Sequence, residues 1–253
     1  MKPALNPALN PAINMHMKPT IAGCIACFAA LLAGPAAAGD FNDIKTLSQE
    51  AFRQLSRDLA SVTALRALSP GVTLSLLGAD IGFEVGITKV DNTDVWRRAG
   101  GGSTDVVTPR LTIHKGLAAG FDIGASIGTA GSSGINTVGG IVRYQFVEPT
   151  TLGPGVTLRL TGNREYGSST VDVRSVGADL ILAKPLVIVT PYVGVGTVHT
   201  NTKARNTGLA SESVNRSRLF VGFDTRLAFA TVSAEAEKSG GATSVASKIG
   251  FRF

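Results

Sequence analysis

The chain has 253 residues, of which 44% are hydrophobic and 17% are charged, and its formal net charge is +6. The apolar content excludes an intrinsically disordered chain, and the length matches about one globular domain. After the N-terminal region, charged residues interrupt every apolar stretch within about ten residues, short of the roughly twenty that a membrane-spanning helix needs, so a helical membrane protein is excluded as well.

Residues 1–38 are predicted to be a leader. Lys18 precedes an apolar stretch over residues 21–32, and small residues follow it, which is typical of a secretory signal. Residues 1–16 repeat Asn-Pro-Ala without a charge pattern, so we interpret them as a doubtful start and residues 17–38 as the signal peptide. The predicted cleavage site is formed by Ala36, Ala38 and Gly39.

The two cysteines of the chain, Cys24 and Cys27, both lie in this leader. The exported part therefore has neither a disulfide nor a cysteine-bound metal, and we expect no cofactor and no metal site. The basic residues form no stripe interleaved with aromatic residues, so nucleic acid is not an expected partner.

Residues 39–78 are predicted to be an amphipathic helix and a linker. Phe52, Leu55, Leu59 and Val62 recur at steps of three and four residues, which predicts a single helix over residues 41–68 that Ser-Pro-Gly at 69–71 ends. Three roles stay open for it: packing on the rest of the protein, a cap or plug on the periplasmic side, and a helix on the inner leaflet.

From Ala79 to Phe253 the apolar residues recur at every second position, which predicts β-strands. Ten such segments can be counted. Long and short connections alternate between them, as in an up-and-down barrel. The predicted outer connections are residues 91–106, 130–136, 163–170, 200–213 and 238–242, and the predicted inner ones are 115–120, 148–155, 183–186 and a turn near 225–227.

The polar sides of these strands carry six basic and six acidic residues, a balance that suits an enclosed lumen in which each charge needs a partner. We predict a lumen charge network of Glu84, Arg110, Asp122, Arg143, Arg159, Asp179, Arg218, Asp224, Glu235, Glu237, Lys248 and Arg252. In a soluble barrel or sandwich the same side chains would face water, so a periplasmic β-protein is the structural alternative.

Ile249, Phe251 and Phe253 alternate at the end of the chain. This pattern resembles the terminal strand of bacterial outer-membrane β-barrels, which the barrel assembly machinery recognises. The resemblance covers residues 79–253 and implies an all-β, antiparallel transmembrane barrel of about ten strands preceded by one amphipathic helix. It also implies the outer membrane as location, its lipid and the assembly machinery as partners, and a periplasmic C-terminus, with the N-terminal helix on the same side.

No catalytic residues are predicted. His114 and His199 are expected at opposite ends of their strands, and the run His199-Thr200-Asn201 only loosely resembles the His-Ser-Asn clusters of outer-membrane lipid hydrolases. The loop with Trp96 and Arg97 is interpreted as a solvated loop, with contact to lipid headgroups as the alternative.

We therefore expect a non-enzymatic outer-membrane barrel with a structural or surface-interaction role, a charge-filled lumen and no identified ligand. The first alternative is a narrow pore or transporter of small hydrophobic solutes, plugged by the N-terminal helix. The second alternative is a lipid-modifying enzyme.

Overall fold

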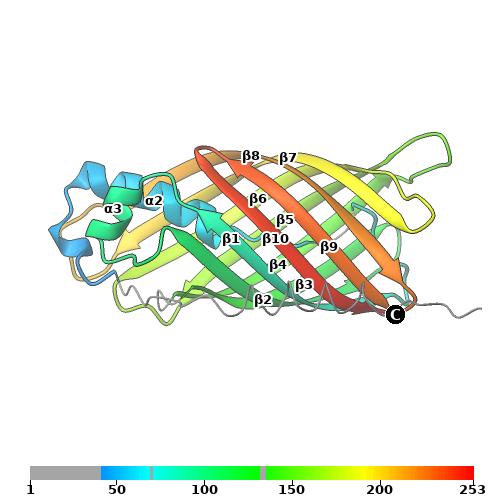
Figure 1. Ribbon diagram of the computed structural model, residues 1–253, viewed down its shortest axis with the longest axis horizontal. Coiled ribbons are helices and arrows are strands. Elements are labelled where there is room, and N and C mark those ends of the chain that lie inside the picture. The colour runs from blue at the N-terminus through cyan, green and yellow to red at the C-terminus, as the bar shows by residue number, and fades with distance from the viewer. Residues whose placement is uncertain (1–40, 69–70, 132–134) are drawn as a thin grey trace, which may run out of the picture. The chain divides into compact units, whose positions relative to one another are not determined.

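The computed structural model describes residues 41–68, 71–131 and 135–253, all of which belong to one compact unit (Figure 1). The leader and its predicted cleavage residues Ala36, Ala38 and Gly39 lie outside the described residues. The helical elements are η1 (Ile44–Thr46), α2 (Gln49–Thr63) and α3 (Thr93–Arg98). The strands are β1 (Ala79–Lys89), β2 (Asp105–Gly116), β3 (Phe121–Ala130), β4 (Ile135–Val147), β5 (Gly155–Tyr166), β6 (Val171–Ala183), β7 (Val189–Ala204), β8 (Glu212–Leu227), β9 (Ala230–Ser239) and β10 (Ala242–Arg252).

The ten strands form a closed antiparallel barrel. Each strand pairs with its neighbours in the sequence, and β1 pairs with β10 from Asp80 opposite Arg252 to Lys89 opposite Thr243. Closure satisfies the backbone hydrogen bonds that an open sheet would leave exposed at its two edges. The predicted strand number and the up-and-down order are confirmed.

The outer wall of the barrel is apolar and the inner wall is charged. Leu111 is 56% exposed and Leu219 is 55% exposed, whereas their neighbours Arg110 and Arg218 are each 3% exposed. A protein that folds in water does not leave such a wall of leucine, isoleucine and valine exposed while it buries its arginines. The chain is therefore a transmembrane barrel of the outer-membrane type, and the soluble periplasmic alternative is wrong.

Aromatic side chains of the wall gather at the end of the barrel where the C-terminus lies. Phe121 stacks on Tyr144 with 4.4 Å between ring centroids, and Phe229 stacks on Phe251 at 6.0 Å. Aromatic rings favour the boundary between lipid tails and headgroups, so these pairs mark one edge of the membrane-spanning band.

The N-terminal helix is shorter than predicted. The Ser48 side chain accepts a hydrogen bond from the Ala51 backbone N–H and caps the start of α2. The helix ends at Thr63, because Ala64 leaves the helical conformation with ψ of 133°. The predicted helical residues 64–68 instead follow as a non-helical segment, in which Ala67 has a positive φ of 50° and the backbone groups bind side chains of the barrel wall.

Three connections also differ clearly from prediction. The predicted outer connection 163–170 is only residues 167–170, because β5 continues to Tyr166. The predicted outer connection 200–213 is only residues 205–211, because β7 continues to Ala204 and β8 already begins at Glu212. Both faces of these strand ends carry polar residues, so apolar alternation does not reveal them. The inner turn predicted near 225–227 lies at Ala228 and Phe229, where Ala228 has a positive φ of 57°.

Candidate functional site

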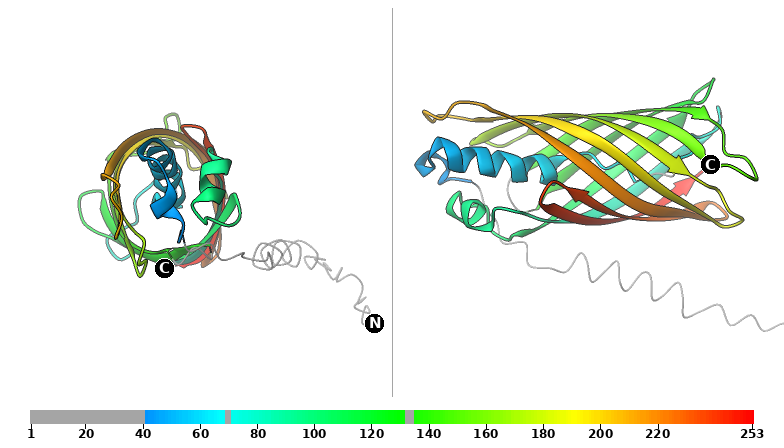
Figure 2. Two further views of the ribbon diagram at one scale, coloured as in Figure 1. Left: turned by 90° about the vertical axis from the view of Figure 1, so that its left-hand side faces the viewer. Right: turned by 90° about the horizontal axis from the view of Figure 1, so that it is seen from above.

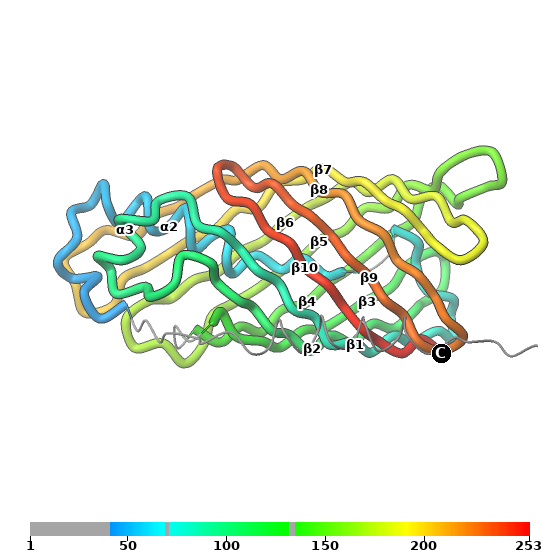
Figure 3. The backbone as a smooth tube through the Cα atoms, in the orientation of Figure 1, coloured from blue at the N-terminus to red at the C-terminus, as the bar shows by residue number. Residues whose placement is uncertain are grey.

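The most distinctive feature of the molecule is its filled lumen. The structure places all twelve residues of the predicted charge network on inward-facing positions of the wall; eleven are buried, and the Arg252 side chain is 11% exposed. Figure 2 shows α2 inside the ring of strands. Residues 64–68 follow α2 into the barrel, and residues 71–78 lie toward the end where β1 begins, with residues 75–77 exposed there (Figure 3). We call the described residues 64–68 and 71–78 the lumen segment.

Asp179 is the centre of the charge network. Arg218 donates from Nε and Nη2 to its two carboxylate oxygens, at 2.5 Å each, and Arg159 donates from Nε to Oδ2 at 2.7 Å. The Arg159 guanidinium also lies over the Phe220 ring, 4.8 Å from its centroid. A Cβ at Gly196 would lie 2.0 Å from Asp179 Oδ1, so only glycine leaves room for the carboxylate there.

A second group of charges lies toward the C-terminal end. Arg143 donates from Nε to Asp122 at 2.7 Å and from Nη2 to the other carboxylate oxygen. Asp80 accepts from Lys248 at 2.5 Å and from Arg252 at 3.0 Å, and Arg252 also binds Asp224. Asp80 was absent from the predicted network, although its parity with Glu84 along β1 is a signal that could have found it.

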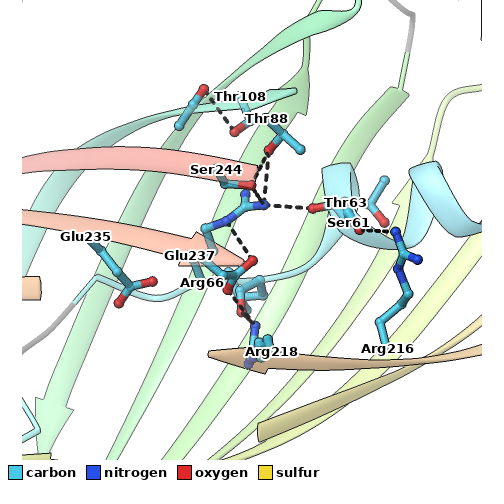
Figure 4. A network of polar contacts seen from close by, with 12 residues as sticks. Ser61, Thr63, Arg66, Thr88, Thr108, Arg216, Arg218, Glu235, Glu237 and Ser244 are labelled. Carbon is cyan, nitrogen blue, oxygen red and sulfur yellow. Dashed lines mark hydrogen bonds and ion pairs between the residues drawn. The ribbon is translucent and has the colours of Figure 1, made fainter. Parts of the chain in front are cut away.

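A third group lies nearer to α2 and is drawn in Figure 4. Arg66 of the lumen segment donates to the Ser61 carbonyl at 2.7 Å and to Thr88 and Ser244 at 3.0 and 2.8 Å, and its Nε lies 3.4 Å from Glu237. Sequence reasoning missed Arg66 because it assigned this residue to the surface of a helix.

The arginines of the wall also bind the backbone of the lumen segment. Arg218 Nη1 donates to the Leu65 carbonyl at 3.3 Å, and Arg159 Nη1 donates to the Ala67 carbonyl at 3.1 Å. The Leu68 N–H in turn donates to Glu84 at 3.3 Å. A buried segment without helix or strand hydrogen bonds cannot satisfy its own peptide groups, so these bonds supply what water would otherwise provide.

The same pattern continues toward the C-terminal end of the lumen. Gln145 accepts from the Thr73 backbone N–H at 2.8 Å, and Asp122 accepts from the Leu74 N–H at 3.3 Å. Thr157 donates to the Gly71 carbonyl. At the rim, outside the lumen, the exposed Lys115 donates to the Leu76 carbonyl at 2.8 Å. The inward side chains therefore have two roles, because they neutralise one another and hold the lumen segment.

At its other end the lumen is closed by an apolar core around α2. Side chains from η1, α2 and the β1–β2 connection pack against the strand ends that lie opposite the C-terminus. The central residues of this core are Phe41, Ile44, Phe52, Leu55, Leu59, Val62, Trp96, Ile135, Val171 and Val173. The Trp96 ring meets Phe41 edge-on, with 4.9 Å between centroids, and its indole N–H donates to the Ser103 carbonyl at 3.0 Å. Trp96 is 1% exposed, so it contacts neither solvent nor lipid headgroups.

Polar contacts fix α2 to this mouth. The Asp58 carboxylate accepts the backbone N–H groups of Asp91 and Asn92, at 3.0 Å each. Burial raises the pKa of this carboxyl, while the two N–H donors act in the opposite direction. Gln49 bonds to Ala210 in the β7–β8 connection, and Arg53 binds Glu212 at 3.1 Å.

These contacts place α2 and the C-terminus at opposite ends of the barrel. Ala79 and Phe253 exchange backbone hydrogen bonds of 3.1 and 2.9 Å at one end, whereas α2 contacts the connections after β1 and β7 at the other. The prediction that the helix and the C-terminus share one side is therefore wrong. The error came from assuming that a segment preceding β1 stays at the end where β1 begins.

His114 and His199 lie on opposite faces of the wall. His114 is 1% exposed and faces the lumen, whereas His199 faces outward and makes a 2.8 Å hydrogen bond to Asn215. Thr200 is fully buried on the inner face, so it cannot join His199 and Asn201 in one catalytic cluster. Among the described residues, no group of three or more His, Asp or Glu side chains is arranged to hold a metal ion.

The predicted C-terminal assembly signal lies on the lipid-facing side of the last strand. Phe251 is 49% exposed, Phe253 is 69% exposed and Ile249 is partly exposed, while Lys248 and Gly250 face inward. Across the part of the chain that the structure describes, no helix has the length and hydropathy to cross a membrane.

No protein-family model and no curated protein matches the sequence. Among solved structures, the KdgM porin in complex with disordered oligogalacturonate is 11% identical, with a TM-score of 0.38, 69% of this chain covered and 99% of that chain. LpxR from Salmonella typhimurium is 10% identical (TM-score 0.36, coverage 68% and 99%), and the attachment invasion locus protein Ail of Yersinia pestis is 13% identical (TM-score 0.29, coverage 70% and 97%).

Proposed function

We propose that this protein is a sealed outer-membrane barrel with a structural or surface-interaction role. The observation that carries the proposal is the occupied lumen: the backbone of residues 65–68 is bound by Arg159, Arg218 and Glu84 in the middle of the barrel. Side chains and the backbone of this segment thus lie in the path that a solute would have to take, which supports a sealed barrel.

The orientation of the barrel belongs to the same proposal. If the C-terminal strand end faces the periplasm, as the terminal phenylalanine pattern implies, the mouth closed by α2 faces the outside of the cell. The surface offered there consists of the outer connections and the exposed side of α2, including Glu50 and Arg53. This surface, rather than a channel, would carry the interaction.

Electrical recording in planar bilayers tests the sealed barrel. We expect the chain from Gly39 onward to give no conductance steps above baseline, whereas a variant that lacks residues 41–68 should give stable ohmic steps, provided that it still shows the heat-modifiable gel migration of a folded barrel. Stable steps from the full chain would contradict the proposal.

A gated pore is the second candidate, and one observation favours it. In the described part of the lumen segment, most hydrogen bonds to the wall come from side chains. Backbone pairing with a strand, as in a sheet, supplies the smaller part. Side-chain contacts can be exchanged one at a time, so the segment could be displaced without unzipping the barrel. In this case the full chain would show brief openings, which the crosslink described in the Discussion would abolish.

The geometry gives little support to an enzyme. His199 and Asn201 face outward from β7 while Thr200 faces inward. His199 is hydrogen-bonded to the Asn215 amide, which could orient the imidazole, but Thr200, the hydroxyl of the predicted run, lies on the other face of the wall and cannot reach it. We therefore infer a non-enzymatic role, which would be contradicted if a purified sample hydrolysed phospholipid or lipopolysaccharide and His199→Ala removed that activity.

A further inference from the structure

A groove of about 510 Å³ runs across the lipid-facing side of strands β4 to β7, near the end that α2 closes. Its floor is formed where Gly140 and Gly162 lie directly opposite each other on β4 and β5. A Cβ at either position would meet nothing within 4 Å. The groove is thus a gap in the outward side-chain layer, left by two glycines at one level of the wall.

The groove has apolar residues on the side toward the C-terminal end of the barrel and polar residues on the side toward α2. Toward the C-terminal end the next outward pair is Val142 opposite Leu160, 41% and 46% exposed, in the apolar band of the wall. Beside the glycines, Val176 is 60% exposed, and His199 lies opposite it on β7. The groove therefore begins among residues that contact lipid tails.

On its other side the groove is bordered by arginines. Arg164 and Arg174 lie directly opposite each other on β5 and β6, and both line the groove. Like charges in such a pair repel each other. Arg174 binds Asp172 at 3.1 Å, but the structure gives Arg164 no ion pair within residues 41–68, 71–131 and 135–253.

The surroundings do not neutralise this charge. Asp172 is shared with Arg205, at 3.3 Å, and Lys203 lies opposite Asp172 on β7. Four outward cations, Arg164, Arg174, Lys203 and Arg205, thus gather around a single carboxylate. A second anion between Arg164 and Arg174 would relieve their repulsion, and guanidinium groups bind phosphate oxygens with two hydrogen bonds.

We propose that this groove binds a membrane lipid with a phosphate-bearing headgroup, whose phosphate lies between Arg164 and Arg174 and whose acyl chain lies over Gly140 and Gly162. The cations stand where the apolar band ends, at the depth of lipid headgroups, and Tyr166 marks the same level at 43% exposure. Asn201, which lies opposite Arg174 and lines the groove, offers an amide to the same headgroup. The site does not depend on whether the lumen conducts.

Lipid binding to the purified full barrel in a neutral detergent tests the arginines. The probe is lipid A, and titration followed by native mass spectrometry gives its affinity. We expect Arg164→Gln combined with Arg174→Gln to weaken lipid A binding at least about tenfold, the scale of one lost charge-assisted contact. The matched control is Arg226→Gln, an exposed arginine near the opposite end of the barrel, which should leave the affinity unchanged. All variants change exposed side chains, and heat-modifiable gel migration confirms that they fold.

Two further measurements distinguish the contribution of the lipid phosphate to binding from that of the acyl chain. Dephosphorylated lipid A should bind the wild type and the double arginine variant equally weakly. Gly140→Leu fills the floor of the groove and should weaken both lipids. Equal lipid A affinity in the wild type and the double arginine variant would overturn the proposal, and so would unchanged binding by Gly140→Leu. Complete displacement of lipid A by about 10 mM inorganic phosphate would overturn it as well, because it would identify a site for free phosphate.

Discussion

Replacing Asp179 with alanine is expected to destabilise the barrel by about 3–5 kcal/mol, because it leaves the Arg159 and Arg218 guanidinium groups buried without their shared carboxylate. Both arginines also hold the backbone of the lumen segment, at Ala67 and Leu65. Their reorientation should therefore loosen this segment together with the wall. Urea unfolding in detergent, followed by the loss of heat-modifiable gel migration, measures the free energy of unfolding.

Asp172→Ala is the matched control for Asp179→Ala. Asp172 lies on the same strand, β6, and also pairs with two arginines, but those arginines, Arg174 and Arg205, are about half exposed. Exposed ion pairs contribute about 0–1 kcal/mol, so this variant should unfold near the wild-type urea concentration. Equal losses in the two variants would show that the Asp179 cluster is no more important than a surface pair.

A disulfide is expected to form between cysteines placed at Gly71 and Ile181. An ideal Cβ at Gly71 lies 3.4 Å from the Ile181 Cβ, close to the separation of about 3.5–4.5 Å in disulfides. The chain from Gly39 onward has no other cysteine. Disulfide formation can therefore be measured by thiol titration and by the altered gel migration of the boiled, non-reduced protein. The crosslink closes a loop of roughly 100 residues, which without strain would stabilise the barrel by up to about 4 kcal/mol. A Cβ at Gly71 also lies 2.8 Å from the Ala183 Cβ, so the segment must shift to admit the cysteine, and this strain reduces the gain.

Gly71→Cys combined with Leu182→Cys is the control for this crosslink. Leu182 follows Ile181 on β6 by one position, but it faces lipid and is 42% exposed, so the barrel wall separates the two thiols. Oxidation of this control as readily as of the first pair would mean that residue 71 does not lie inside the barrel. In bilayer recordings the first pair also separates the two candidate functions, because reduction should change nothing in a sealed barrel and should restore openings in a gated pore.

The wall of the barrel could be predicted from the sequence because strands have a period of two. Once Phe83 is assigned to the lipid side, Glu84 must face inward, and the same parity applies along each strand. The polar strand end at Thr200 to Ala204 could not be recognised in this way, because from the level of the lipid headgroups outward the outer face no longer needs to be apolar.

The contents of the lumen could not be predicted from the sequence. The apolar face of α2 shows that Phe52 and Leu59 will be buried, but it does not show against what, and their partners come from strands far along the chain. The non-helical course of residues 64–68 has no local signature either. It depends on arginines that lie roughly 90 and 150 residues later, at Arg159 and Arg218.

The seam between β1 and β10 has a consequence for the order of events during biogenesis. Residues 65–68, which precede β1, are bound inside the ring, and the ring is completed only when the last strand of the chain joins the first. The N-terminal residues must already lie among the strands when β1 and β10 pair. Otherwise they must enter the closed barrel afterwards, from the end where the C-terminus lies. Enclosure before zipping is the simpler route, since the wall can then fold around the residues that it surrounds.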